Sequence, residues 1–191
     1  MLKIFFIIWM LLLYFLTGCG GKASPSHYVS QDIDLSFIKR VAVLPLDNLT
    51  NDKFAGDAVR QVVISELLAS GLVDVVCPGD AVAALETLKL KTGQSPNADQ
   101  IKAIGKALKV QAVIIGAVSK YGEIREGNVS APEVSITLMM ADTGSGSIIW
   151  SVTKTRGGAG FWARHFGARA DTMSEAMLKV VREAIKTLYK Y

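Results

Sequence analysis

The sequence predicts one α/β domain in which a mixed β-sheet is covered by helices. Short apolar runs bounded by turn residues are typical of buried strands. Between them lie stretches whose apolar residues recur three or four positions apart, as in amphipathic helices. Two of the runs flank a short Gly-containing connection, which predicts an antiparallel hairpin. Because strands and helices do not alternate strictly, we do not expect a doubly wound parallel sheet.

The first half of the domain predicts two strands, each followed by a helix. Residues 39–48 (KRVAVLPLDN) form a short apolar run that a proline and an Asp-Asn turn close. An amphipathic helix is expected over 54–70, followed directly by a glycine, the residue that helix ends favour. A second strand, LVDVV at 72–76, precedes a helix over 80–90 that we expect Asp80 to cap.

The second half predicts a helix and then three strands. One face of 98–108 is apolar, and the run at 110–119 (VQAVIIGAVS) reads as a central strand. Residues 121–132 are charged and contain glycine, which predicts a loop or an irregular edge. The hairpin strands are expected over 133–141 and 147–153, around DTGSG.

The last helix has the clearest signature. Thr172 and Glu175 have the spacing of a capping box. From Met173 to Leu188 the apolar residues form one stripe. We therefore expect this helix to lie with its apolar stripe against the sheet.

The N-terminus predicts a lipoprotein signal peptide over 1–18. One basic residue, Lys3, precedes thirteen apolar residues at 4–16. That run is shorter than the roughly 20 residues of a membrane-spanning helix and fits a signal h-region. The following LTGC resembles the bacterial lipobox, whose thiol is alkylated, whose peptide is cut before the cysteine and whose new amine is acylated, as with palmitate. Cys19 is therefore the expected lipidation site and membrane attachment point. The alternatives are an ordinary signal with an incidental cysteine and an uncleaved anchor helix.

Gly20 bears on the membrane in which the protein resides. In the enteric lipoprotein pattern an aspartate after the lipidated cysteine retains the protein in the inner membrane, and here the residue is glycine. That resemblance implies an outer-membrane location facing the periplasm. Residues 19–36 are small, polar and aperiodic, so we expect a lipidated tether there and a periplasmic α/β domain over 37–191. Without residues 1–18 the chain has 173 residues, a length that suits one domain.

Composition and motifs give no support to catalysis or to nucleic-acid binding. Removal of Lys3 with the signal peptide lowers the net charge from +4 to +3, which is too small to argue for nucleic acid. The two histidines, His27 and His165, lie far apart, without a partner at metal-ligand spacing. GAGFWA at 158–163 matches the dinucleotide pattern G-x-G-x-x-A, but no second strand with an acidic end follows it, so we do not expect nucleotide binding. The sequence has no G-K-[ST] loop and no G-x-S-x-G motif. We expect no catalytic residue, metal or cofactor.

Cys77 is the second cysteine of the chain. It closes the apolar run VDVVC. We expect a buried thiol that packs as a small hydrophobic residue, with an intermolecular disulfide or a reactive thiol as the alternatives.

The stretch from Thr143 to Ala170 has no acidic residue and predicts a binding surface just before the last helix. Arginine together with tryptophan or phenylalanine is the composition of interface anchors. The expected partner is an acidic protein face or lipid phosphates, which guanidinium groups bind in bidentate fashion. In the alternative interpretation the aromatic side chains fill the protein's own core. The candidate residues are Arg156, Phe161, Trp162, Arg164, Phe166 and Arg169.

Several segments, in order and spacing, resemble the curli assembly and transport lipoprotein family and its shorter relatives. These segments are VAVLPLDNLTND, DAVRQVVISELLASGLVDVV, IKAIGKALKVQAVIIGAVSKYG and VSITLMMADTGSGSIIWS. The relatives include lipoprotein activators of penicillin-binding proteins and the TolB amino-terminal-like domain. The resemblance implies an anticodon-binding-domain-like sandwich that contacts proteins and not RNA, and it carries over no catalytic residue.

The expected function is that of a lipid-anchored interaction module in envelope biogenesis or export, bound to an envelope protein or to itself. A subunit of an outer-membrane secretion pore, a surface-exposed antigen and an unrecognised enzyme remain as alternatives. A membrane strand needs about 9 to 11 residues. The predicted hairpin offers only about seven per arm, on the strand lengths expected from the pattern. On this length argument we expect no pore.

Overall fold

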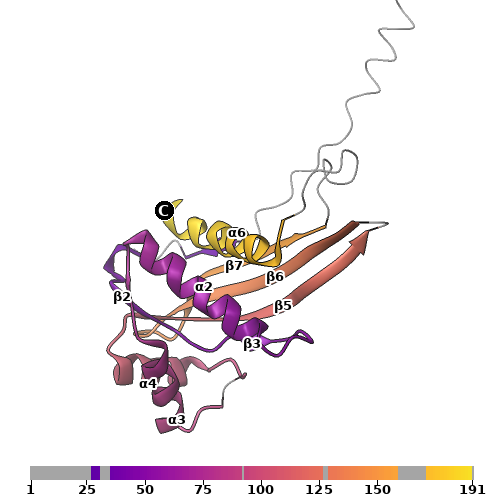
Figure 1. Cartoon of the computed structure of the whole chain (residues 1–191). Coiled ribbons are helices and arrows are strands. Elements are labelled where there is room, and N and C mark those ends of the chain that lie inside the picture. Colours follow the sequence, from indigo (N-terminus) through magenta and orange to yellow (C-terminus); the bar gives the residue numbers. More distant parts are fainter. Residues whose placement is uncertain (1–26, 31–34, 92, 127–128, 159–170, 191) are drawn as a thin grey trace, which may run out of the picture.

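The computed structural model describes residues 27–30, 35–91, 93–126, 129–158 and 171–190. Its centre is a seven-stranded sheet with the order β1-β7-β6-β5-β2-β4, in which β3 pairs with β5 away from this path (Figure 1). The described strands are β1 (His27–Val29), β2 (Arg40–Val43), β3 (Asp47–Asn48), β4 (Asp74–Val75), β5 (Ala112–Glu126), β6 (Val129–Asp142) and β7 (Ile148–Gly157). The described helices are η1 (Leu35–Phe37), α2 (Ala55–Ser70), α3 (Pro78–Thr87), α4 (Ala98–Leu108), α6 (Met173–Ile185) and η2 (Lys186–Lys190).

The sheet combines parallel and antiparallel pairs, as the sequence predicts. β2 is parallel to both β4 and β5, and β3 is also parallel to β5. The strands β5, β6 and β7 form an antiparallel meander, and β1 lies antiparallel to β7. The α/β class with a mixed sheet covered by helices is therefore confirmed.

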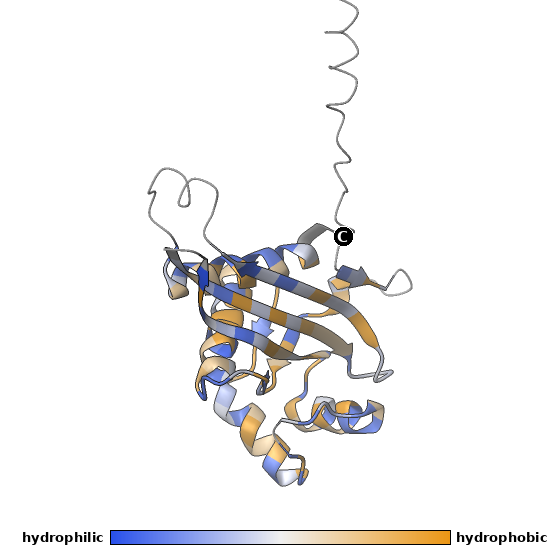
Figure 2. Cartoon of the chain, turned by 90° about the vertical axis from the view of Figure 1, so that its right-hand side faces the viewer, coloured by the Kyte–Doolittle hydropathy of each residue, from blue (hydrophilic) through white to orange (hydrophobic). Residues whose placement is uncertain are grey.

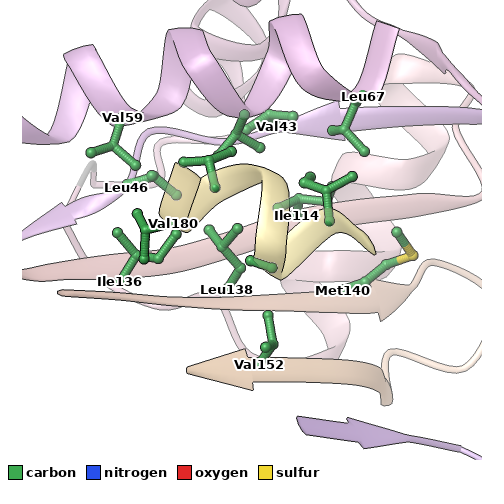
Figure 3. Packing of buried hydrophobic residues seen from close by; sticks show 14 of the residues in the cluster. Val43, Leu46, Val59, Leu67, Ile114, Ile136, Leu138, Met140, Val152 and Val180 are labelled. Carbon is green, nitrogen blue, oxygen red and sulfur yellow. The ribbon is translucent and has the colours of Figure 1, made fainter. Parts of the chain in front are cut away.

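One face of the sheet is covered by α2 and α6, and this side holds the larger core. Figure 3 shows side chains of α2, such as Val59 and Leu67, above those of β5 and β6, such as Ile136 and Leu138. Trp150 is fully buried in this cluster, and its indole N–H donates to the Thr187 hydroxyl at 2.9 Å. The capping box at Thr172 and Glu175 is present, so the predicted start of the last helix is confirmed.

The opposite face carries a smaller core under α3 and α4. This cluster includes Val113 and Ile115 of β5 and Ala141 of β6, and among the described residues it includes no β5 residue beyond Ile115. Further along, β6 and β7 present hydroxyl side chains there: Ser135 lies 2.8 Å from Thr155, and Thr137 lies 3.0 Å from Thr153, between hydroxyl oxygens. Figure 2 shows hydrophobic and hydrophilic bands alternating along these strands.

Two glycines in the segments that carry the family resemblance stand at close approaches. A Cβ on Gly105 of α4 would lie 2.3 Å from the Thr143 side chain, where the helix meets the β6–β7 turn. A Cβ on Gly116 of β5 would lie 2.1 Å from the Thr137 carbonyl oxygen. Both distances are shorter than any ordinary van der Waals contact, so each position requires glycine.

The prediction of a loop over 121–132 is wrong. β5 and β6 continue through this region and pair up to Glu126 and Val129. Glu123 and Arg125 stand on exposed positions of β5, and backbone pairing compensates for a composition that disfavours strands. The arms of the predicted hairpin are β6 with 14 residues and β7 with 10, both longer than the roughly seven expected. The length argument against a pore therefore no longer stands.

Two further boundaries differ from the sequence prediction. The helix expected from Asp80 begins at Pro78, because proline at the first helical position needs no hydrogen-bond acceptor, and Asp80 lies in its first turn. The segment expected as a tether contains β1, whose Val29 packs against the larger core. A three-residue strand is too short to show an alternating pattern, which is why the sequence does not reveal it.

The expectation that the Cys77 thiol is buried is wrong. The thiol is free and exposed, not buried. Cys77 is the residue directly before α3, where the chain turns out of the sheet. The apolar run therefore ends at Val76, which is 3 % exposed.

Candidate functional site

Most of the predicted binding residues lie outside the part of the chain that the structure describes. This holds for the lipidation site, Cys19, and for Phe161, Trp162, Arg164, Phe166 and Arg169. Arg156 is described, at the end of β7. Whether the other predicted residues gather around Arg156 therefore lies outside the described part of the chain.

Arg156 takes part in an ion-pair cluster between β7 and α6. Its Nε lies 3.1 Å from Asp171 Oδ2, and its Nη1 lies 3.4 Å from Glu183 Oε1. Lys179 also pairs with Asp171. The hydrogen bond from Lys179, followed by that from Arg156, holds the pKa of the Asp171 carboxyl below its usual value, although partial burial acts in the opposite direction. The cluster joins the end of β7 to Asp171, just before α6, and to Glu183, near the C-terminal end of that helix.

A second ion pair joins the two helices that cover the larger core. Arg182 of α6 donates from Nε and Nη2 to the two carboxylate oxygens of Glu66 of α2, both at 2.9 Å. This bidentate bond lowers the pKa of Glu66, against the opposing effect of burial. The relative position of α2 and α6 is thereby fixed above the sheet.

A groove of about 550 Å³ opens at the end of the sheet where α2 and η2 finish, and the sequence analysis missed it. Its walls come from η1, the residues before β2, the C-terminal end of α2, the end of β6 and η2. Most of the lining is apolar. The lining side chains are Leu35, Ser36, Ile38, Lys39, Leu67, Ser70, Leu72, Val73, Met140 and Leu188.

One exposed apolar side chain lines this groove, and two others belong to residues next to lining residues in the sequence. Leu72 lines it and is 54 % exposed, and Leu68, next to the lining Leu67, is 53 % exposed. Phe37 lies in the sequence between the lining residues Ser36 and Ile38, and it is 46 % exposed. Exposed apolar side chains close to an apolar groove favour a binding site, whereas isolated exposed residues need no explanation. The groove together with Phe37 and Leu68 is called the apolar groove below.

Lys39 adds a positive charge to the apolar groove. It is exposed, and its backbone N–H donates to the side-chain oxygen of Gln111 at 3.2 Å. The backbone of this lysine is thus held in place while its ammonium group remains at the rim. An apolar partner surface with a neighbouring carboxylate would match this arrangement.

A second pair of exposed apolar residues lies at the opposite end of α2. Leu49 is 69 % exposed and Phe54 is 64 % exposed. They belong to the turn between β3 and α2, where Asn48 and Asp52 fix the chain through hydrogen bonds. Neither residue lines the apolar groove, which makes them suitable controls for it.

Arg60 is a buried arginine with a structural role. Directly after β4, the Val76 N–H donates to the Val41 carbonyl oxygen of β2. The next acceptor on β2 is the Val43 carbonyl oxygen, and the residue in line to donate to it is Pro78, which has no N–H. Arg60 replaces that donor, with Nε 3.0 Å and Nη2 2.8 Å from the Val43 oxygen. Burial lowers the pKa of this guanidinium.

The described residues give no sign of a metal site or of a membrane-spanning helix. Their His, Cys, Asp and Glu side chains nowhere gather in threes around a point that could hold an ion. In the same residues, no helix has both the length and the apolar composition that a membrane crossing requires.

Comparisons with known proteins show a shared fold. No protein-family model matches the chain, and no curated protein matches it. The PelC dodecamer from Paraburkholderia phytofirmans is 21% identical, covers 85% of this chain and 94% of that chain, and has a TM-score of 0.59. Lipoprotein GNA1162 from Neisseria meningitidis is 15% identical, covers 80% of this chain and 99% of that chain, and has a TM-score of 0.55.

A third structure, the LpoB C-terminal domain from Salmonella enterica, is less similar. It is 18% identical, covers 62% of this chain and 82% of that chain, and has a TM-score of 0.48. That score is too low to support an argument. The predicted resemblance to small lipoprotein domains is thus confirmed at the level of fold by GNA1162, and the relationship to the curli assembly family stays a prediction.

Proposed function

We propose that the chain is an envelope lipoprotein, anchored through acylated Cys19 in the outer membrane and facing the periplasm, whose α/β domain binds an envelope protein through the apolar groove. The observation that carries the binding role is the groove itself, whose lining includes the half-exposed Leu72, with exposed Phe37 and Leu68 next to lining residues in the sequence. Leaving that much apolar surface in water costs about 25 cal/mol per Å², which binding of a partner recovers.

The partner is a protein that presents apolar side chains next to a carboxylate. Apolar walls favour aliphatic or aromatic side chains, and Lys39 at the rim favours an acidic residue beside them. A bound nucleic acid would need many cations at one surface, and the groove lining contains one. The shared fold with a lipoprotein supports the same class of function.

The anchoring part of the proposal is tested by labelling cells with palmitate. The wild-type chain should take up the label, and Cys19→Ala should remain an unlabelled precursor. Cys77→Ser is the matched control, because it removes the other thiol and should leave labelling unchanged. Equal labelling of Cys19→Ala and wild type would refute lipidation at this residue.

The binding part is tested by photocrosslinking in intact cells, with a photoreactive amino acid at Leu72 or, as control, at Leu49. We expect one discrete adduct with an envelope protein from position 72 and none from position 49. Leu68→Asp should weaken binding of that purified protein at least tenfold, about 1.4 kcal/mol. Leu49→Asp should leave the affinity unchanged, since it is as exposed but lies away from the groove.

Three outcomes contradict this part. Equal adducts from both positions would show that the groove is not selective, and an unchanged affinity for Leu68→Asp would place the contact elsewhere. An adduct formed solely with a second copy of the chain would replace the envelope partner with self-association. Sedimentation of the purified protein identifies that last case.

The basic aromatic segment before α6 is proposed as a second contact, for an acidic protein face or lipid phosphates. If Trp162 anchors an interface, Trp162→Ala should cost about 2 kcal/mol or more of binding free energy and leave the melting temperature unchanged. If its ring fills the core, the same change should cost about 3 to 5 kcal/mol of stability. The second result would end the docking role of this residue.

A further inference from the structure

We propose that the protein partner of the apolar groove binds as an extended segment, which adds a strand to the free edge of β4. The inference rests on the binding role proposed for the groove, and it supplies the form in which the partner binds. β4 is the last strand of the sheet order, and it pairs with β2 on one side. Among the described residues, no strand pairs with its other side.

The hydrogen bonds of β4 show which of its backbone groups point away from β2. The N–H groups of Asp74 and Val76 donate to carbonyl oxygens of β2 and of the residue before it, at 2.7 and 2.9 Å. Within one trans peptide the N–H and the C=O point in opposite directions, so the carbonyl groups of Val73 and Val75 point outward. The Val75 N–H lies between the two inward N–H groups and also points outward. In the described residues, none of these outward groups has a hydrogen-bond partner.

An edge with outward N–H and C=O groups is a template for a further strand. An extended segment of another protein can pair with such groups through its own backbone. The edge spans residues 72–76, about 16 Å at the usual rise of a strand. It is bounded by Gly71, which ends α2, and by Pro78, which begins α3. The added strand is therefore short, about three to five residues.

The apolar groove adjoins this edge. Leu72 and Val73 line the groove and lead directly into β4. The side chains of Val73 and Val75 pack against the larger core, so they lie on the face of the sheet that α2 covers. When a strand is added to a sheet, backbone hydrogen bonds supply affinity and pockets for alternate side chains supply specificity. A segment paired with β4 directs every second side chain towards this face, where the groove accepts an apolar one.

The charges on the two faces predict the sequence pattern of the segment. On the groove face, Lys39 favours an acidic residue beside the apolar ones. On the other face, Asp74 is exposed, because side chains alternate along β4. Opposite charges on neighbouring strands stabilise a sheet, so the residue beside Asp74 should be basic or carry a hydroxyl group. The partner segment therefore alternates apolar or acidic residues with basic or hydroxyl residues.

The strand addition is tested in intact cells with the photoreactive amino acid at Leu72. Val75→Pro removes the outward N–H and leaves the inward bonds of β4, since an edge strand accepts proline at such a position. It should reduce the yield of the envelope-protein adduct at least about tenfold. Val75→Ala is the matched control, because it shortens the same side chain but keeps the N–H, and its yield should stay within about twofold of the original. Immunoblots of the membrane fraction check that both variants accumulate equally.

The outcomes separate this inference from the proposed function. Equal adduct yields from Val75→Pro and Val75→Ala would overturn the strand addition. A loss with Leu68→Asp but not with Val75→Pro would retain the groove as the binding site and reject the strand. Unchanged adducts with both Leu68→Asp and Val75→Pro would refute the groove itself.

Amide hydrogen exchange tests the same pairing without a variant, also in case Val75→Pro does not fold. The isotope-labelled full-length protein is studied by NMR in detergent, with and without the envelope protein recovered from the crosslink at position 72. The Val75 N–H should exchange at least about tenfold more slowly in the complex. The Val76 N–H is the control, because it already donates to β2 and should change less. A complex in which the Val75 N–H exchanges at the free rate would overturn the strand addition.

Discussion

The two faces of β6 and β7 differ in what covers them. On one face α2 and α6 bury Ile136, Leu138 and Val152 completely or nearly so. On the other face, the same strands carry Thr137 and Thr153, whose hydroxyl groups pair with each other and remain accessible. The same two strands thus carry a core on one side and a polar surface on the other, so burial on one face does not require an apolar opposite face.

The largest expected loss of stability comes from a substitution on the covered face of the sheet. Trp150→Ala removes a fully buried indole and should lower the free energy of unfolding by about 3 to 5 kcal/mol. Urea unfolding followed by circular dichroism measures this loss. Trp150→Phe retains a ring but removes the donor to Thr187, and it should cost less. Equal losses for the two variants would show that the hydrogen bond, not packing, dominates.

The next effect concerns the edge where β4 ends. Arg60→Met keeps a long apolar stem but removes the donors to the Val43 carbonyl, which should cost about 1 to 3 kcal/mol of stability. The exposed neighbour Gln61→Met should stay within about 0.5 kcal/mol of wild type. An Arg60→Met protein as stable as wild type would mean that water satisfies the carbonyl equally well.

A smaller effect depends on pH. The pKa of Asp171 is lowered in the folded protein, so its ion pairs stabilise the fold above the unfolded pKa and are lost as the pH falls below about 4. Asp171→Asn should therefore be less stable than wild type at pH 7, by up to about 1 kcal/mol for such pairs. Melting temperatures at pH 7 and pH 3 should show the gap closing. A gap that stays constant would assign the stabilisation to packing.

The smallest effect lies on the open face. Thr137→Val exchanges an accessible hydroxyl for a methyl group of similar size and should change stability by no more than about 0.5 kcal/mol. The same unfolding experiment measures it. A loss comparable to that of Trp150→Ala would mean that this face is also covered, and the comparison between faces would fail.

The sequence predicts the covered face better than the ends of the sheet. Alternation over 133–141 and the stripe of α6 are local signals of burial, so the positions of β6 and α6 follow from them. Residues 121–132 lack such a signal, because charged residues and glycine interrupt the apolar pattern there. Pairing with the strand that follows directly in the sequence makes this region a strand.

The sequence predicts the candidate site even less well than it predicts the ends of the sheet. Leu67 belongs to the predicted apolar stripe of α2, but its neighbour Leu68 falls outside the stripe and gives no signal by itself. The apolar groove joins η1, α2, β6 and η2, which no local pattern relates to one another. The exposed pair Leu68 and Leu72, four residues apart across the end of α2, was the one signal that could have indicated it.

The position of β1 has a consequence for the order of folding. Val29 pairs with Trp150, across a separation of more than a hundred residues, whereas β5, β6 and β7 pair with immediate neighbours in the chain. Closing so large a loop costs conformational entropy that local hairpins do not incur. The meander can therefore form early, and the strand synthesised first should join the sheet last. Its docking completes the fold only after β7 is in place, so substitutions in β1 should speed unfolding and leave the folding rate unchanged.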